Sequence, residues 1–281
     1  MRPRYALLAA LVLLAGAAVG AAPAQPRIVS LAPHLTELVY AAGAGHLLVG
    51  VVEYSDYPDA ARSVPRIGDA WRVDLERLLA LKPDVVLTWA SGTPDEVIER
   101  LDALGLAHRE IATFRLADVP LASQTIGVIA GTADTAAAAA SRFDSEIAEL
   151  KRAYQAARPL SVFIQLDDQP VYTVNGRHII SEVVELCGGR NVFADLPQLA
   201  PPVSLEAVIA ADPEAIVSTD DTIADPMAMW RRWEGMRAVR AGAVYSLPAD
   251  TMARATPRLA AGVRATCSAL DDARRRRERA G

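Results

Sequence analysis

One segment of the sequence recurs in the second half of the chain. DLERLLALKPDVVLT (74–88) and SLEAVIAADPEAIVS (204–218) align without gaps at an offset of 130 residues, with identities at Leu75/Leu205, Glu76/Glu206, Ala80/Ala210 and Pro83/Pro213. Each copy opens with a helix N-cap candidate and an acidic first turn, which the helix dipole favours, and ends with a proline and a strand pattern. The recurrence predicts a duplicated architecture with two similar α/β lobes.

Short strand patterns alternate with helical patterns from Arg27 onward. The first half has apolar, strand-like runs at 27–31, 47–51, 84–88 and 107–111, with helical periodicity at 34–43, 74–81 and 96–105. A second series begins with the strand-like run at 161–166 and includes another at 243–247. Alternation at this pace indicates parallel sheets flanked by helices.

The strongest helical pattern lies between the two series. Residues 134–157 contain neither glycine nor proline and include five consecutive alanines, which predicts a helix about 36 Å long. We therefore expect an N-terminal lobe at 27–132, a rigid connecting helix at 133–158 and a C-terminal lobe at 159–281, with a ligand cleft between the lobes. A surface helix packed on one larger domain is the alternative.

The N-terminus has the composition of a secretory signal. Arg2 and Arg4 precede an apolar stretch from Ala6 to Val19, and small residues follow. This pattern predicts a signal peptide at 1–24, cleaved near Ala22 or Ala24. The alternative, an uncleaved membrane anchor, needs about 20 apolar residues. A net charge of −5 argues against nucleic acid as a partner.

The sequence contains two cysteines, Cys187 and Cys267. In an exported protein we expect them to form one disulfide, whereas a reducing compartment would leave two buried thiols. Both lie in the second half of the chain, which is therefore expected to fold as its own unit.

Aromatic and charged residues follow several predicted strands. In α/β lobes, ligands gather beyond the carboxyl ends of the strands, and aromatic rings there would give a cleft flat apolar walls. The candidates in or near such loops are Tyr54, Trp71, Trp89, Tyr172, Asp250 and Arg254. Trp89 has the alternative of covering the core. We interpret Tyr57, which precedes Pro58, as structural, and Trp230 and Trp233 as helix packing.

Motifs for catalysis or metal binding do not occur in the sequence. The four histidines, His34, His46, His108 and His178, are scattered without zinc-ligand spacing. Nucleophile-elbow, P-loop and dinucleotide-binding motifs are also missing. We therefore expect no catalytic residues, no protein metal site and a binding protein rather than an enzyme. His34 has two interpretations, a residue facing the cleft or one that merely starts a helix.

The order of motifs along nearly the whole mature chain resembles the periplasmic cobalamin (vitamin B12)-binding proteins of ABC importers. The motifs are RIVSLAPHLTELVYAAG, YSDYP, W-x-x-DLERLLALKPDVVLTW, CGGRNVF, VSLEAV and ARATPRL. These proteins form part of class III, whose members have a helical backbone between two lobes and bind metal chelates. The resemblance implies a periplasmic monomer that captures cobalamin or another corrinoid, without a cofactor of its own. The resemblance further implies that the protein delivers this ligand to permease subunits in the inner membrane.

The resemblance also implies roles for individual residues. Tyr54, Trp71 and Trp89 match ring positions that line the cobalamin cleft, Tyr172 falls at a cleft phenylalanine, and Asp250 and Arg254 match a polar pair near the corrin side chains. Glu76 and Glu206 match carboxylates that dock onto permease arginines, although the helix dipole alone would also favour glutamate there. Cys187 and Cys267 match the family disulfide.

The sequence departs from the family in the second lobe. Ala200 stands where the family has a tryptophan, and Thr251 and Met252 stand at aromatic positions. With fewer aromatic rings in this lobe, the alternatives are weaker binding of the corrin, a different corrinoid as the ligand, or haem or an iron-siderophore as the ligand. A secreted α/β enzyme using Asp167, Asp168 or His178 is a rival from another class.

Overall fold

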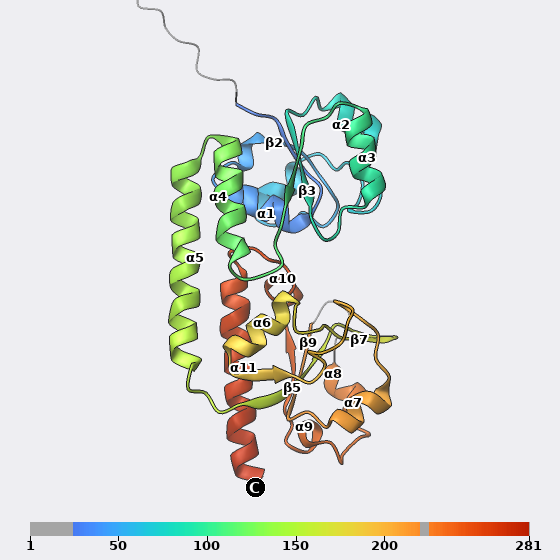
Figure 1. Cartoon of the computed structure of the whole chain (residues 1–281), viewed down its shortest axis with the longest axis vertical. Helices are drawn as coiled ribbons and strands as arrows, with labels where there is room; N and C mark the ends of the chain where they lie inside the picture. The colour runs from blue at the N-terminus through green and yellow to red at the C-terminus, as the bar shows by residue number, and fades with distance from the viewer. Residues whose placement is uncertain (1–24, 220–224, 281) are drawn as a thin grey trace, which may run out of the picture.

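The computed structural model describes residues 25–219 and 225–280, so the predicted signal peptide at 1–24 lies outside the described residues. The chain forms two lobes, one above the other, beside two long helices that run along the long axis of the molecule (Figure 1). Within the described ranges, no helix has the length and apolar character needed to cross a membrane.

The N-terminal lobe contains a parallel four-stranded sheet in the order β2-β1-β3-β4. Its strands are β1 (Ile28–Ser30), β2 (Leu48–Val51), β3 (Val85–Trp89) and β4 (His108–Ile111). Its helices are α1 (Pro33–Ala41), α2 (Leu75–Ala80), α3 (Asp95–Ala103) and α4 (Asp118–Ala130), with 3-10 turns η1 (Gly45–Leu47) and η2 (Asp59–Ser63). The four predicted strands of this half are confirmed.

The C-terminal lobe repeats this topology. Its parallel sheet has the order β8-β5-β9-β10, from β5 (Leu160–Gln165), β8 (Gly189–Asn191), β9 (Ala215–Thr219) and β10 (Val244–Leu247). In both sheets the first strand in sequence lies between the second and the third. β3 and β9, the strands of the recurring segment, occupy the same third place. The shared order confirms the prediction of two similar lobes.

The remaining elements of the second half complete this lobe. A small antiparallel hairpin is formed by β6 (Asp167–Asp168) and β7 (Val171–Tyr172). The helices are α6 (Ile179–Leu186), α7 (Leu205–Ala211), α8 (Pro226–Trp230), α9 (Arg237–Arg240), α10 (Ala249–Met252) and α11 (Leu259–Ala280).

The recurring segments also share their helix caps. The carboxylate of Asp74 accepts a hydrogen bond from the backbone N–H of Arg77 at 3.0 Å. The hydroxyl of Ser204 accepts one from the N–H of Ala207 at 3.1 Å. Both predicted N-caps are therefore confirmed, and they fix where Glu76 and Glu206 enter the first turns of α2 and α7.

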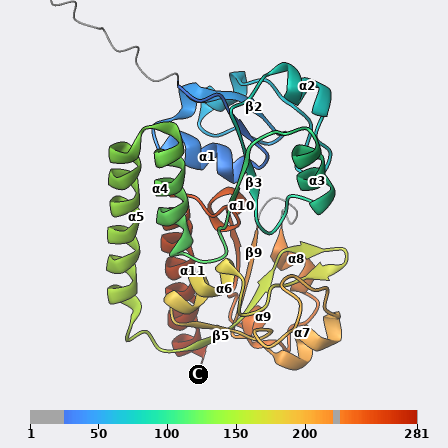
Figure 2. The ribbon, with the colours of Figure 1, turned by 45° about the horizontal axis from the view of Figure 1, so that its top comes forward.

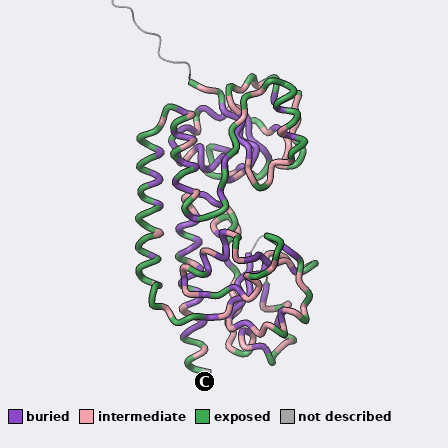
Figure 3. Tube along the Cα trace, in the orientation of Figure 1, coloured by how far each residue is buried: buried purple, intermediate pink, exposed green. Residues whose placement is uncertain are grey.

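The predicted connecting helix is α5 (Ala133–Tyr154), which ends earlier than expected. A residue that precedes proline disfavours the helical backbone conformation. Because Arg158 precedes Pro159, the helix ends before Arg158. α5 runs outermost alongside both lobes (Figures 1 and 2), and its exposed and buried residues alternate along its length (Figure 3). At Gly127 of α4, an added Cβ would lie 2.3 Å from Cβ of Ala136. The connector is thus also a packed surface helix.

A continuous apolar core joins residues of both lobes with the long helices, and it includes Leu87, Phe143 and Leu270. The predicted disulfide is present: Cys187, at the end of α6, is bonded to Cys267 of α11, and both residues are fully buried. The packing role expected for Trp230 is confirmed, because its buried indole N–H donates to the side-chain oxygen of Gln165 at 2.8 Å.

Candidate ligand-binding cleft

A cavity of about 410 Å³ lies between the two lobes, as expected for their fold. In the N-terminal lobe, the lining residues lie at or just after the carboxyl ends of β1, β3 and β4. In the C-terminal lobe, they come from the start of α6, the loop before α7 and the segment after α10. The residues that matter for its chemistry are His34, Trp89, Phe114, His178, Leu199 and Arg254. Both its volume and its place at the strand ends are typical of small-molecule sites.

Trp89 ends β3 and forms an aromatic wall of this cavity. Its ring lies directly over Gly92, where an added Cβ would come within 2.0 Å of the ring. Its other neighbour is the His34 ring, edge-on, with ring centres 5.0 Å apart and an interplanar angle of 74°. Both expected roles of Trp89 therefore hold, because its ring packs against the core and also lines the cavity.

Two histidines, one from each lobe, face the cavity as neutral groups. Burial, followed by the nearby positive charge of Arg254, lowers the pKa of His34 to about 4. Burial lowers the pKa of His178 to about 4 as well. The Nδ1 atom of His178 accepts the N–H of Ile180 at 3.2 Å and caps α6. His34 starts α1 and lines the cavity, so both of its interpretations hold.

Arg254 and Asp250 form the predicted polar pair. A terminal guanidinium nitrogen of Arg254 lies 2.9 Å from a carboxylate oxygen of Asp250. Arg254 lines the cavity, while the more exposed Asp250 stands behind it. The structure thus brings together two of the residues singled out at the end of the strand at 244–247.

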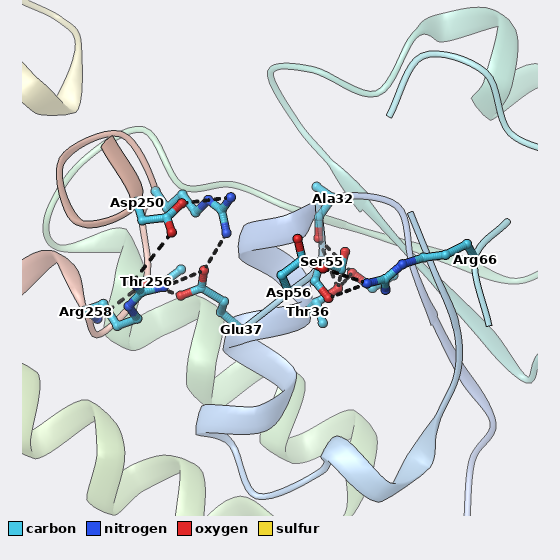
Figure 4. Close-up of polar contacts among 11 residues, drawn as sticks. Ala32, Thr36, Glu37, Ser55, Asp56, Arg66, Asp250, Thr256 and Arg258 are labelled. Atoms are coloured by element: carbon cyan, nitrogen blue, oxygen red, sulfur yellow. Dashed lines mark hydrogen bonds and ion pairs between the residues drawn. The ribbon is translucent and has the colours of Figure 1, made fainter. Parts of the chain in front are cut away.

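Glu37, on α1, was not predicted to belong to the site, yet it joins the two lobes. Its carboxylate lies 3.0 Å from Arg254 and 3.3 Å from Arg258, and it accepts a hydrogen bond from the Thr256 hydroxyl at 3.2 Å. Figure 4 shows Glu37 directed from α1 toward this segment of the C-terminal lobe. The available sequence signal was an acidic residue within an otherwise apolar helix.

The other predicted rings lie outside the lining of this cavity. Tyr54 and Trp71 are 72% and 66% exposed, and Tyr172, on β7, is partly exposed. Tyr54 has a φ of 63°, which is uncommon for a residue other than glycine. The guanidinium of Arg258 covers the ring of Tyr57 at 3.9 Å, so Tyr57 braces the lobe contact as well as its own loop.

The departures noted in the second lobe fall at different places. Ala200 lines the cavity, so the tryptophan that the family resemblance implies at this position would stand at its wall. Met252, which is buried, and the half-buried Thr251 do not line the cavity. Phe114, Arg177 and Leu199 line the cavity but were not predicted. Phe114 follows β4, so the strand-end rule could have found it.

Glu76 and Glu206 are exposed in the first turns of α2 and α7, at corresponding positions of the recurring segments. Figure 1 shows α2 on the N-terminal lobe and α7 on the C-terminal lobe. Of the enzyme candidates, Asp167 and Asp168 form β6, and His178 caps α6. In the part of the chain described, no cluster of three or more histidine, cysteine or acidic residues is arranged to hold a metal ion.

Comparison with known proteins agrees with this architecture. The family model described as "Periplasmic binding protein" matches residues 28–251. The vitamin B12-binding protein of Vibrio cholerae serotype O1 is 36% identical over 249 residues, covering 88% of this chain and 90% of the relative.

Solved structures resemble most of the chain. The crystal structure of the periplasmic vitamin B12-binding protein BtuF of Vibrio cholerae has a TM-score of 0.84 at 35% identity, covering 89% of this chain and 98% of BtuF. The periplasmic haem-binding protein BhuT in complex with two haems has a TM-score of 0.80 at 25% identity, covering 88% and 98%. The chain belongs to the periplasmic binding protein family, whose members bind solutes and are not enzymes.

Proposed function

We propose that this protein captures cobalamin in the periplasm and delivers it to an ABC importer. The observation that carries the proposal is the cavity between the lobes, where an indole ring, two neutral imidazoles and two arginines face a common space. Such a surface suits a large ligand with apolar faces and peripheral amides. The relatives named for vitamin B12 binding support this choice of ligand.

The proposed binding residues are those that the sequence analysis singled out. The rings of Tyr54, Trp71, Trp89 and Tyr172 would contact the corrin faces, and Asp250 and Arg254 would hydrogen-bond to its peripheral amides. Tyr54 and Trp71 are exposed, so their rings are accessible to a ligand that extends beyond the cavity. The left-handed backbone of Tyr54 supports a role in ligand contact, since strained residues cluster at binding sites.

The organisation of the chain suits a cleft that changes little on binding. We propose lobes at 27–132 and 159–281 around a connector at 133–158, with α5 packed along both. A preformed cleft avoids the ordering costs that reduce affinity. We further propose export through a signal peptide at 1–24. Docking would use Glu76 and Glu206, since exposed charges at corresponding places can orient a partner.

Haem or an iron-siderophore is the second candidate ligand. The structural neighbour BhuT is named for haem binding, and Ala200 leaves the cavity wall without the ring that the resemblance to cobalamin-binding proteins implies there. Cobalamin and haem are both metal chelates with flat faces, so the same walls would suit either of these two.

Titration separates these ligands. Purified mature protein would be mixed with cyanocobalamin, haemin and ferric siderophores, and binding followed by visible spectra and calorimetry. We expect one cyanocobalamin per protein at micromolar concentration or below. Leu121→Ala, an exposed apolar change on α4, serves as a control outside the cleft. Saturable binding of haemin or a siderophore, without cyanocobalamin binding, would favour the second candidate.

A further inference from the structure

Four charged side chains form a closed network across the lobe boundary beside the cavity. Arg254 and Arg258 each lie near the same two carboxylates, Glu37 from the N-terminal lobe and Asp250 from the C-terminal lobe. The side chain of Glu37 is 2% exposed, whereas that of Asp250 is 54% exposed. Glu37 is therefore the buried centre of the network, and its partners among the described residues, Arg254, Thr256 and Arg258, all belong to the other lobe.

Arg254 is held by this network at two of its nitrogens. One terminal nitrogen contacts Glu37 at 3.0 Å and the other contacts Asp250 at 2.9 Å. Its Nε–H has no partner among the described residues, and the side chain lines the cavity. Two contacts, one at each terminal nitrogen, prevent the planar guanidinium from rotating. Its remaining N–H donors therefore keep one orientation.

The residue beside Glu37, Thr36, contacts the loop at 54–57, which carries Tyr54. The hydroxyl of Thr36 lies 3.1 Å from that of Ser55, which is buried next to Tyr54. Arg66 donates to the Ser55 carbonyl at 3.0 Å and to Asp56 at 2.9 Å. In Figure 4, Thr36 and Glu37 point from α1 in different directions, one toward this loop and the other toward the C-terminal lobe.

We propose that Glu37 is a positioning residue of the binding cleft. Through its contacts with Arg254 and Arg258 it keeps residues 250–258 seated on the N-terminal lobe and fixes the donors of Arg254 before the ligand arrives. Adjacent residues of one helix turn thus contact both residues 250–258 and the loop that carries Tyr54. The effect on ligand binding rests on the proposed function, whereas the seating of residues 250–258 does not.

Hydrogen exchange tests the seating without any ligand. Glu37→Gln removes the buried charge at nearly constant size, and we expect amide exchange in 250–258 to rise at least tenfold. Glu146→Gln is the matched control, because Glu146 forms an exposed ion pair with Arg264 at 3.0 Å between α5 and α11. Unchanged exchange in Glu37→Gln would overturn the proposal. Glu37→Asp keeps the charge and should show an intermediate increase if the glutamine variant fails to fold.

Ligand affinity then tests the positioning through a double-mutant cycle. We expect Glu37→Gln and Arg254→Gln each to weaken cyanocobalamin binding about tenfold or more, and the double variant to bind no more weakly than Arg254→Gln alone. Losses that multiply would show that Glu37 does not act through Arg254, and would overturn this part. If the wild-type protein binds no cyanocobalamin, the proposed ligand is wrong, and the exchange measurement still decides the role of Glu37.

Discussion

The two cavity histidines should make the folded protein sensitive to mild acid. His34 and His178 both have folded-state pKa values of about 4, against 6.5 for an unperturbed histidine. Between these values the unfolded chain binds more protons than the folded protein. The stability is therefore fully present above pH 6.5 and is lost as the pH falls toward 4. From pH 7 to pH 5 the loss is about 2 kcal/mol for each histidine, or about 4 kcal/mol together.

Urea unfolding at pH 7 and pH 5 measures this loss. The comparison is between the wild-type protein and His34→Gln/His178→Gln, in which both titrating groups are removed and all carboxylates remain. The control is His46→Gln, because His46 is exposed in η1 and away from the cavity lining. We expect the double variant to lose about 4 kcal/mol less than the wild-type protein over this range. An equal loss in the two proteins would refute the assignment of neutral, buried imidazoles.

Three further changes follow from the structure. Replacing Cys187 and Cys267 by serine should lower the free energy of unfolding by roughly 4 kcal/mol, because the disulfide spans 80 residues. Urea unfolding measures this loss, and a value below about 1 kcal/mol would contradict the prediction. Trp89→Ala should weaken cyanocobalamin binding, measured by calorimetry, by about 2 kcal/mol, or ~30-fold. Unchanged affinity would show that Trp89 does not contact the ligand. Charge reversal at Glu76 and Glu206 should abolish transport into reconstituted vesicles but leave affinity intact; a loss of affinity would contradict a docking role.

Much of the fold was predictable because local patterns and tertiary structure agree. The recurring segments at 74–88 and 204–218 carry their own caps, proline stops and apolar strands, and they form matching third strands in the two sheets. The connecting helix was predictable for the same reason, since a long stretch without glycine or proline has few alternatives. Its end at Tyr154 was missed because the pattern continues in helix-forming residues to Ala157.

The site was predictable only where chemistry follows a strand end. Trp89 and Arg254 line the cavity and were found by that rule. Glu37 was missed, because its importance depends on arginines more than 200 positions away, and no local pattern reports such a contact. Long-range pairing of this kind is decided by how the lobes meet. The same holds for His178, whose place in the cavity depends on the approach of α6 to the N-terminal lobe.

A crystal structure of the protein grown with cyanocobalamin would test the central claim most directly. We expect one corrin ring between the lobes, in contact with Trp89 and hydrogen-bonded to Arg254, with Glu37 still paired to that arginine. Corrin density outside the cleft, or a cleft that stays empty at saturating ligand, would contradict it.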